Sequence, residues 1–366
     1  MALILTVIVV ALVFEYINGF HDTANSIATV VSTKVLTPRL AILLAAVTNL
    51  VGALYGTAVA KTISSGVLDD HLYPADWKSW MLVCALGGAI VWNLLTWWFG
   101  LPSSSSHALI GGLVGAGIAA AGNNTAVVIL SRPKEGMPWY KFDGILYKVI
   151  IPMFLSPVMG LVVGLVVMTL LYIFLRSWSP KWVSRVFGKA QLASAMFMGF
   201  SHGSNDAQKT MGIIALALVG AKAGMLDQLP QWLDFLRHPM MKDAAGGEGI
   251  ATWIKVTCAL TMAAGTAAGG WKIIKTMGHK MVKLQPVHGF AAETTAAAVL
   301  MTAAHFGMPV STTHAMTTSI MGVGCAKRFS ALNFSVVERI LWAWFLTLPM
   351  TALVAYGLFR IARIAG

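Results

Sequence analysis

The chain is dominated by long apolar stretches that follow one another with short polar connections between them. A membrane-crossing helix needs about 20 mostly apolar residues. Only 11% of the residues are charged, against roughly 25% in soluble domains. The sequence therefore predicts an all-α, polytopic membrane protein. The expected segments are residues 3–33, 40–60, 80–99, 102–120, 144–175, 190–220, 251–271, 286–306, 308–326 and 331–359.

The first apolar stretch and the cysteines narrow the class further. Residues 1–18 lack a basic leading segment and an Ala-x-Ala cleavage site, so we interpret them as a first transmembrane segment rather than a signal peptide. Cys84, Cys258 and Cys325 lie in apolar stretches without C-x-x-C spacing, which argues against a disulfide framework or a zinc site. We expect buried small side chains, with no cofactor and no firm metal site.

The charge distribution predicts an orientation. A net charge of +12 would favour nucleic acid in a soluble protein, but Lys and Arg mark cytoplasmic loops in membrane proteins. Placing the purely basic connections in the cytoplasm puts both termini outside, although Arg132, Lys134, Lys141 and Lys148 then also lie outside. The basic connections contain Lys34 and Arg39; Arg176, Lys181, Arg185 and Lys189; Lys272, Lys275, Lys280 and Lys283; and Lys327 and Arg328. The acids gather in other loops, at Asp69, Asp70 and Asp76 and at Asp227, Asp234, Asp243 and Glu248.

Two unusual motifs recur in the same order, which indicates an internal duplication. GFHDTANS at residues 19–26 aligns with GFSHGSND at 199–206, a shift of 180 residues that matches Asn25 with Asn205. LPSSSSHALIGGLVGAG at 101–117 aligns with MPVSTTHAMTTSIMGVG at 308–324, a shift of 207. We therefore expect a first membrane repeat at 1–178 and a second at 179–366. The loop charges predict an inverted-topology repeat, the architecture of secondary transporters whose sites lie near the membrane midplane.

The recurring motifs suit an anion that moves together with cations. The first pair puts Gly, Asn, Asp and His inside apolar spans, so we expect broken helices there. A break frees N–H groups that attract anions and C=O groups that, with Asp22 and Asp206, hold cations or a proton. In the second pair we expect two re-entrant helical hairpins, each turning at a Pro-Ser/Thr run. A hydroxyl-capped helix N-terminus is an anion site, and these runs supply Ser104, Ser105, Ser106, Ser311, Thr312 and Thr313.

Simpler explanations compete for several of these residues. Ser and Thr in membrane helices often bond to their own helix or pack at a helix interface. Close helix packing also explains Gly111, Gly115, Gly160 and Gly164. A structural role at the hairpin tips suits His107 and His314, and a proton-carrying role suits His21 and His202.

Three further charged residues have two interpretations each. Glu15 and Glu293 are isolated acids in apolar spans, which makes them candidates for cation coupling or for structural pairing. Lys209 follows the second signature by three residues. It is either the partner of Asp206 or a cationic contact for the transported anion.

The signatures at residues 19–26 and 201–209, together with the runs PSSSSH and PVSTTH, resemble those of the PiT family of inorganic phosphate transporters, in its bacterial low-affinity branch. The resemblance covers nearly the whole chain. It implies a homodimer in the cell (inner) membrane that carries phosphate with H⁺ or Na⁺, in the bacterial branch often as a metal–phosphate complex. The implied binding positions are Asp22, Asn25, Asn205, Asp206 and the two Ser/Thr runs. The family also contains sulfate permeases, which are the alternative.

Two other classes of membrane protein compete with a transporter. An intramembrane hydrolase or metalloenzyme would need a nucleophile–base pair or an H-E-x-x-H motif, and the sequence has neither. We therefore expect no enzymatic activity. A passive anion channel shares inverted repeats with carriers, and only counterflow and saturation of flux separate the two.

Overall fold

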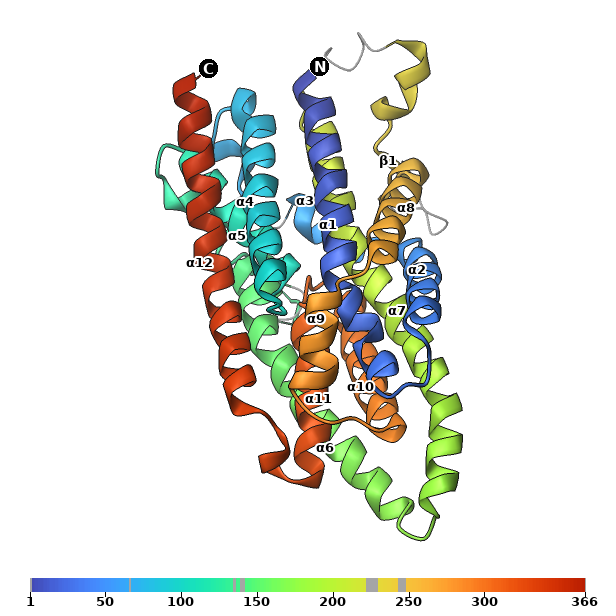
Figure 1. Cartoon of the computed structure of the whole chain (residues 1–366). Helices are drawn as coiled ribbons and strands as arrows, with labels where there is room; N and C mark the ends of the chain where they lie inside the picture. Colours follow the sequence, from blue (N-terminus) through green and yellow to red (C-terminus); the bar gives the residue numbers. More distant parts are fainter. Residues whose placement is uncertain are drawn as a thin grey trace.

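The computed structural model describes residues 2–65, 67–133, 136–138, 142–221, 230–242 and 248–365. Four of the loop charges considered for orientation, Lys134, Lys141, Asp227 and Asp243, lie outside these ranges. The predicted all-α class is confirmed (Figure 1), with one small antiparallel pair, β1 (Met240–Lys242) and β2 (Glu248–Ile250). The helices are α1 (Ala2–Ser32), α2 (Pro38–Ala53), α3 (Ala58–Ser65), α4 (Lys78–Phe99), α5 (Ser105–Ala120), α6 (Ile151–Phe174), α7 (Pro180–Val219), α8 (Thr252–Ala268), α9 (Trp271–Lys275), α10 (Pro286–His305), α11 (Thr312–Lys327) and α12 (Phe334–Ala365).

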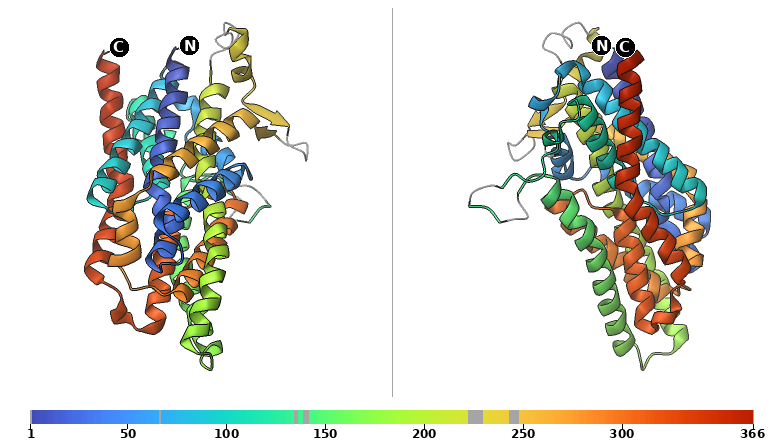
Figure 2. Two further views of the ribbon diagram at one scale, coloured as in Figure 1. Left: turned by 45° about the vertical axis from the view of Figure 1, so that its right-hand side comes forward. Right: turned by 90° about the vertical axis from the view of Figure 1, so that its left-hand side faces the viewer.

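Four described helical segments are long and apolar enough to cross a membrane, by length and composition: Ala2–Ser32, Ala75–Phe99, Leu146–Phe174 and Phe334–Ile364. The apolar helices α2 and α5 are shorter. The start of α1 and the end of α12 lie at the same end of the molecule, as all three views show (Figures 1 and 2). The basic link between α6 and α7 lies at the other end. These features describe a multi-pass membrane protein.

Helices α1 and α7 carry the two signatures through the molecule in opposite directions (Figure 1). Thr210, late in α7, donates a hydrogen bond to Glu15, early in α1. Both helices continue unbroken across their signatures, so the expected interruption there is wrong. The polar side chains find partners on neighbouring helices, and burial inside protein removes the need to open the backbone.

The chain is interrupted instead at the tips of two helical hairpins, α4–α5 and α10–α11. Gly100 (φ 65°) and Gly307 (φ 64°) end the first helix of each hairpin in the left-handed conformation that favours glycine. Ser104 and Ser311 then cap α5 and α11, each accepting a 3.1 Å hydrogen bond from a backbone N–H. In Figure 1, α4 and α5 occupy the half of the molecule in which α1 begins, and α10 and α11 the other half.

Glycines let the second helix of each hairpin approach its neighbour closely. A Cβ on Gly115 would lie 2.0 Å from the carbonyl oxygen of Ala352 on α12. A Cβ on Gly160 of α6 would lie 2.4 Å from the hydroxyl of Thr318 on α11. Gly111 and Gly164 face α12 and α11 in the same way. The interpretation of these glycines as packing residues is confirmed.

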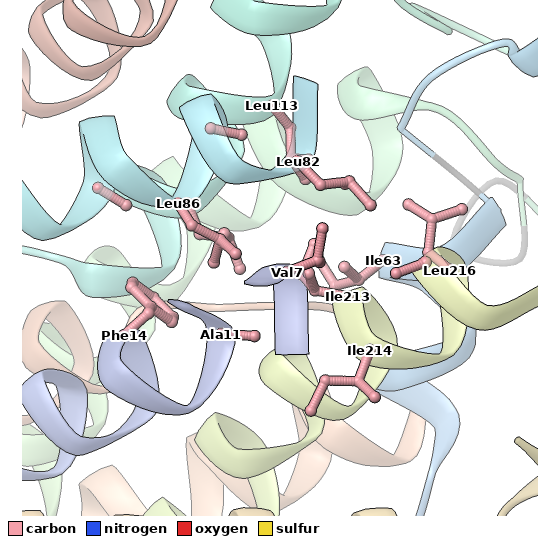
Figure 3. Close-up of a cluster of buried hydrophobic side chains, with 14 of the residues drawn as sticks. Val7, Ala11, Phe14, Ile63, Leu82, Leu86, Leu113, Ile213, Ile214 and Leu216 are labelled. Atoms are coloured by element: carbon pink, nitrogen blue, oxygen red, sulfur yellow. The ribbon is translucent and has the colours of Figure 1, made fainter. Parts of the chain in front are cut away.

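The buried core consists of two apolar clusters. One surrounds the first part of α1 and the last part of α7; Figure 3 shows Val7, Phe14, Leu86, Ile213 and Leu216 from it. The other surrounds the last part of α1 and the first part of α7. Along both helices the signature lies between the two clusters, so its buried polar side chains form a layer between them.

Four close contacts relate the two halves of the chain. A Cβ on Gly19 would lie 2.4 Å from the carbonyl oxygen of Met262, and one on Gly203 would lie 2.2 Å from that of Asn49. Gly265 meets the carbonyl of Tyr16, and Gly52 meets that of Phe200, at 2.1 Å each. In both pairs of contacts, the residue on α7 has a number 184 higher than its counterpart on α1, and the residue on α8 has a number 213 higher than its counterpart on α2. The three-dimensional equivalents are therefore Asp22 with Asp206 and Asn25 with Lys209, not Asn25 with Asn205.

Candidate ion-binding site

The polar layer is closed off from solvent. The signature residues and the hairpin tips meet there, and each of the thirteen side chains named next has at most 2% of its surface exposed. They are His21, Asp22, Asn25, Ser104, Ser105, Ser106, His202, Asn205, Asp206, Lys209, Ser311, Thr312 and Thr313. The structure thus brings together most of the predicted site. Among the described residues, these side chains are therefore covered by other parts of the protein.

Asp22 connects α1 to both hairpins. Its Oδ2 accepts a 2.5 Å hydrogen bond from the hydroxyl of Ser105, at the first residue of α5. Its Oδ1 lies 2.6 Å from Nδ1 of His21 and accepts from Thr313, at 3.5 Å. The carboxylate therefore lies where the N-termini of α5 and α11 converge.

Asp206 has an equivalent position on α7. One of its oxygens is bound by the ammonium group of Lys209. The other lies 3.1 Å from Nε2 of His202 and accepts a 3.1 Å hydrogen bond from Thr312. A buried carboxylate is costly unless it is paired and hydrogen-bonded, and these three partners provide that compensation.

Asn25 and the hydroxyls of α11 form the contact between the first signature and the second hairpin. The amide of Asn25 donates to Thr312 (3.2 Å) and Thr313 (3.0 Å). The two tips also touch directly, since Ser106 donates to the carbonyl of Val310 at 3.2 Å. The hydroxyls of both hairpin tips therefore lie close together beside Asn25, each near the N-terminus of α5 or α11.

Within the polar layer, the side chain of Asn205 indicates a ligand. It is fully buried, yet neither its Oδ1 nor its Nδ2 has a hydrogen-bond partner among the described residues. An unpaired buried amide costs on the order of 1–3 kcal/mol per group. An ion or water that pairs with it recovers that free energy.

Asp22, His202 and Asp206 form a possible cation site. One ligand atom from each lies within 4.8 Å of the others, and all three side chains are buried. Two carboxylates and an imidazole suit a cation that binds oxygen and nitrogen. The predicted cation-coupling role of Asp22 and Asp206 is geometrically reasonable, with His202 as an additional ligand.

Glu15 and Glu293 are buried but lie away from this centre. Glu15 and Thr29 are each seven residues from Asp22 on α1, about 10 Å in opposite directions along the helix. Glu15 accepts a hydrogen bond from Thr210, and its other oxygen has no hydrogen-bond partner in the described part of the chain. Glu293 accepts from Thr29 (2.5 Å), from Gln191 (3.1 Å) and from Ser194. One acid therefore flanks the centre on each side.

Several predicted residues have structural roles. Ser104 and Ser311 cap helices. The rings of His107 and His314 pack edge to face at 4.8 Å, which agrees with a role at the hairpin tips. The ammonium of Lys209 has three protein partners, so the structure favours its role as the partner of Asp206 over contact with an anion.

The sequence interpretation missed the residues that orient the two histidines. Nε2 of His21 lies 3.2 Å from Thr96 and 3.5 Å from Ser103. Nδ1 of His202 lies 3.1 Å from Asn49. Isolated Thr and Asn residues in apolar spans were the available signal, but their partners lie 75 and 153 residues away in the sequence.

The fold and the site define a polytopic helical membrane protein with a buried polar centre between two helical hairpins. Residues 18–355 match the sequence model of the phosphate transporter family. The chain belongs to this family, as its resemblance to the PiT transporters predicted, and its role is transport rather than catalysis.

Individual relatives agree with this assignment. The chain is 42% identical over 352 residues to a probable low-affinity inorganic phosphate transporter of Bacillus subtilis, covering 96% of this chain and 95% of that protein. It is 30% identical over 421 residues to a putative phosphate permease of Thermococcus kodakarensis, covering 99% and 98%. A solved structure of a sodium-dependent phosphate transporter shares the fold, with a TM-score of 0.80 at 21% identity over the full length of both chains.

Proposed function

We propose that this protein is a secondary active transporter that carries inorganic phosphate together with H⁺ or Na⁺, as free phosphate or as a metal–phosphate complex. One observation carries the proposal. Acidic side chains suited to a cation and helix N-termini suited to an anion converge in one enclosed layer, beside the unpartnered amide of Asn205. The names of the relatives supply phosphate as the anion.

Phosphate would be bound by hydroxyls, amides and helix N-termini. Asn25, Asn205, Ser105, Ser106, Thr312 and Thr313 are the proposed contacts. Neutral donors at helix N-termini stabilise an anion without an arginine, which suits an ion that must also be released. The hydrogen bonds from Asn25 to the second tip and from Ser106 to Val310 would be exchanged for bonds to the phosphate oxygens.

The cations would be bound by the acids. Asp22 and Asp206, with His202, would hold a cation beside the phosphate, and Glu15 and Glu293 would serve as sites along its path on either side. Coupling is needed because divalent phosphate entering a negative-inside cell opposes the potential by about 2.3 kcal/mol per charge per 100 mV. A cotransported divalent metal would act as cargo at the same carboxylates.

Alternating access would follow from two repeats, 1–178 and 179–366, inserted in opposite directions. The antiparallel course of α1 and α7 and the paired glycine contacts support this division. With the basic links in the cytoplasm, both termini lie outside the cell membrane. The protein would work as a homodimer.

Uptake of radiolabelled phosphate into proteoliposomes tests the proposal. We expect saturable uptake that rises when a proton or sodium gradient is imposed, exchange with internal phosphate, and competition by arsenate but not by sulfate. Uptake that responds to neither gradient would refute coupling. Preferential competition by sulfate would refute phosphate as the substrate.

A further inference from the structure

Lys209 is an unusual residue in the centre of a membrane protein. Its side chain is 1% exposed, and its ammonium group contacts three protein oxygens: a carboxylate oxygen of Asp206, the hydroxyl of Ser106 and the carbonyl of Val310. An ammonium group has three N–H donors. Three partners therefore account for all of them, and none is left for a phosphate oxygen.

The partners of Lys209 are those of a small cation. A carboxylate, a hydroxyl and a backbone carbonyl are the oxygen ligands that alkali and other hard cations take in proteins. Two of the three come from the hairpin tips, Ser106 from the first and Val310 from the second. The ammonium thus lies in a ready-made cation position that spans the two tips.

Among the described residues of the other half of the molecule, the equivalent carboxylate has no lysine beside it. The glycine contacts make Asn25 the equivalent of Lys209 and Asp22 the equivalent of Asp206. The Asn25 amide donates to Thr312 and Thr313, and within the described part of the chain the oxygens of Asp22 have hydroxyl and imidazole partners. One carboxylate therefore has a lysine ammonium as its partner and the other does not.

We propose that the Lys209 ammonium is a built-in counter-cation that occupies the place of one mobile cation at Asp206. The proposal rests on the proposed transport function and deepens it. With both imidazoles, His21 and His202, in the neutral form, the charges of Asp22, Asp206 and Lys209 sum to −1, so one monovalent cation neutralises the empty centre. Without the ammonium the sum is −2, and an uncompensated buried charge is strongly unfavourable. Its removal therefore opens a second mobile cation site.

The test counts bound cations in purified protein without phosphate. Equilibrium binding of radiolabelled Na⁺ is measured at pH 6 and pH 8.5 for the wild type, for Lys209→Met, and for the double variant Asp206→Asn with Lys209→Met. We expect Lys209→Met to bind one Na⁺ per chain more than the wild type, at one or both pH values. The double variant should return to the wild-type number, because its centre again has a charge of −1.

The matched control is Lys181→Met, the same substitution at an exposed position of α7. Size-exclusion profiles and melting curves identify the variants that fold. If folded Lys209→Met binds no additional Na⁺ at either pH, the proposal is wrong. Loss of phosphate binding with an unchanged Na⁺ count would also refute it, and would make Lys209 an anion contact. Phosphate uptake by the wild type is measured separately, so failure of the transport function would not alter the Na⁺ count.

Discussion

Replacing Asp22 with Asn tests the centre most directly. The substitution keeps the size of the side chain and removes its charge. One amide oxygen remains to accept from Ser105 or from His21, and the other position becomes an NH₂ donor. A lost hydrogen bond to a charged group costs about 1.5–3 kcal/mol. Because a buried charge is also removed, we expect the variant to fold and insert into the membrane.

The effect on cation binding follows from the geometry. The ligand atoms of Asp22, His202 and Asp206 lie within 4.8 Å of one another, so a cation among them is about 3 Å from each ligand atom and about 4 Å from the centre of each carboxylate charge. At an effective dielectric constant of about 20, loss of one such interaction costs ~4 kcal/mol. Since about 1.4 kcal/mol corresponds to tenfold, cation affinity should fall roughly 700-fold.

The assay is initial-rate phosphate uptake into proteoliposomes at a coupling-cation concentration below half saturation. We expect Asp22→Asn to lose at least 100-fold in rate, because below half saturation the rate follows the affinity for the cation. Glu338→Gln, the same chemical change at an exposed position of α12, should transport like the wild type. Uptake by Asp22→Asn within threefold of the wild type would refute the role of this carboxylate and the charge arithmetic together.

Three further outcomes are expected. Gly115→Ala should lower the melting temperature in detergent, with a loss of ~1–3 kcal/mol in the free energy of unfolding, because the new Cβ would lie 2.0 Å from the Ala352 carbonyl oxygen. The control Gly357→Ala should not lower it, because nothing lies within 4 Å of that Cβ. Equal melting temperatures for the two variants would contradict the packing argument. Glu293→Gln should fold, because the amide oxygen can still accept from the neighbouring donors. It should raise the cation concentration needed for half-maximal uptake about tenfold, because the negative charge that would attract a cation there is lost. An unchanged cation dependence would remove Glu293 from coupling. In the loop before α4, burial and the neighbouring Asp70 raise the pKa of Tyr73. Folding then favours the neutral phenol. The contribution of Tyr73 to the free energy of unfolding is therefore complete below pH ~10 and declines as the pH rises further. Melting curves between pH 8 and 11 should show that decline in the wild type and a smaller one in Tyr73→Phe.

The residues of the site were identifiable from the sequence because polar groups in an apolar span are expensive and therefore informative. Asp22, Asp206 and the hydroxyls of both tips stand out for that reason, and all of them meet in the polar layer. The helical hairpins were predictable as well, since each Pro-containing run cannot continue a helix and supplies a Ser that caps the next one, Ser104 or Ser311.

The sequence by itself determined the class of protein, its helices, its family and most of the residues in its centre, because hydropathy and capping act over a few neighbouring residues. Only the tertiary structure decided that α1 and α7 run unbroken through their signatures, since partners on other helices satisfy the polar groups. The structural equivalence of Asn25 and Lys209 likewise came from helix packing, because Gly19 meets the backbone of Met262 and Gly203 meets that of Asn49. Local sequence similarity does not show this equivalence, because the contacts join segments more than 150 residues apart.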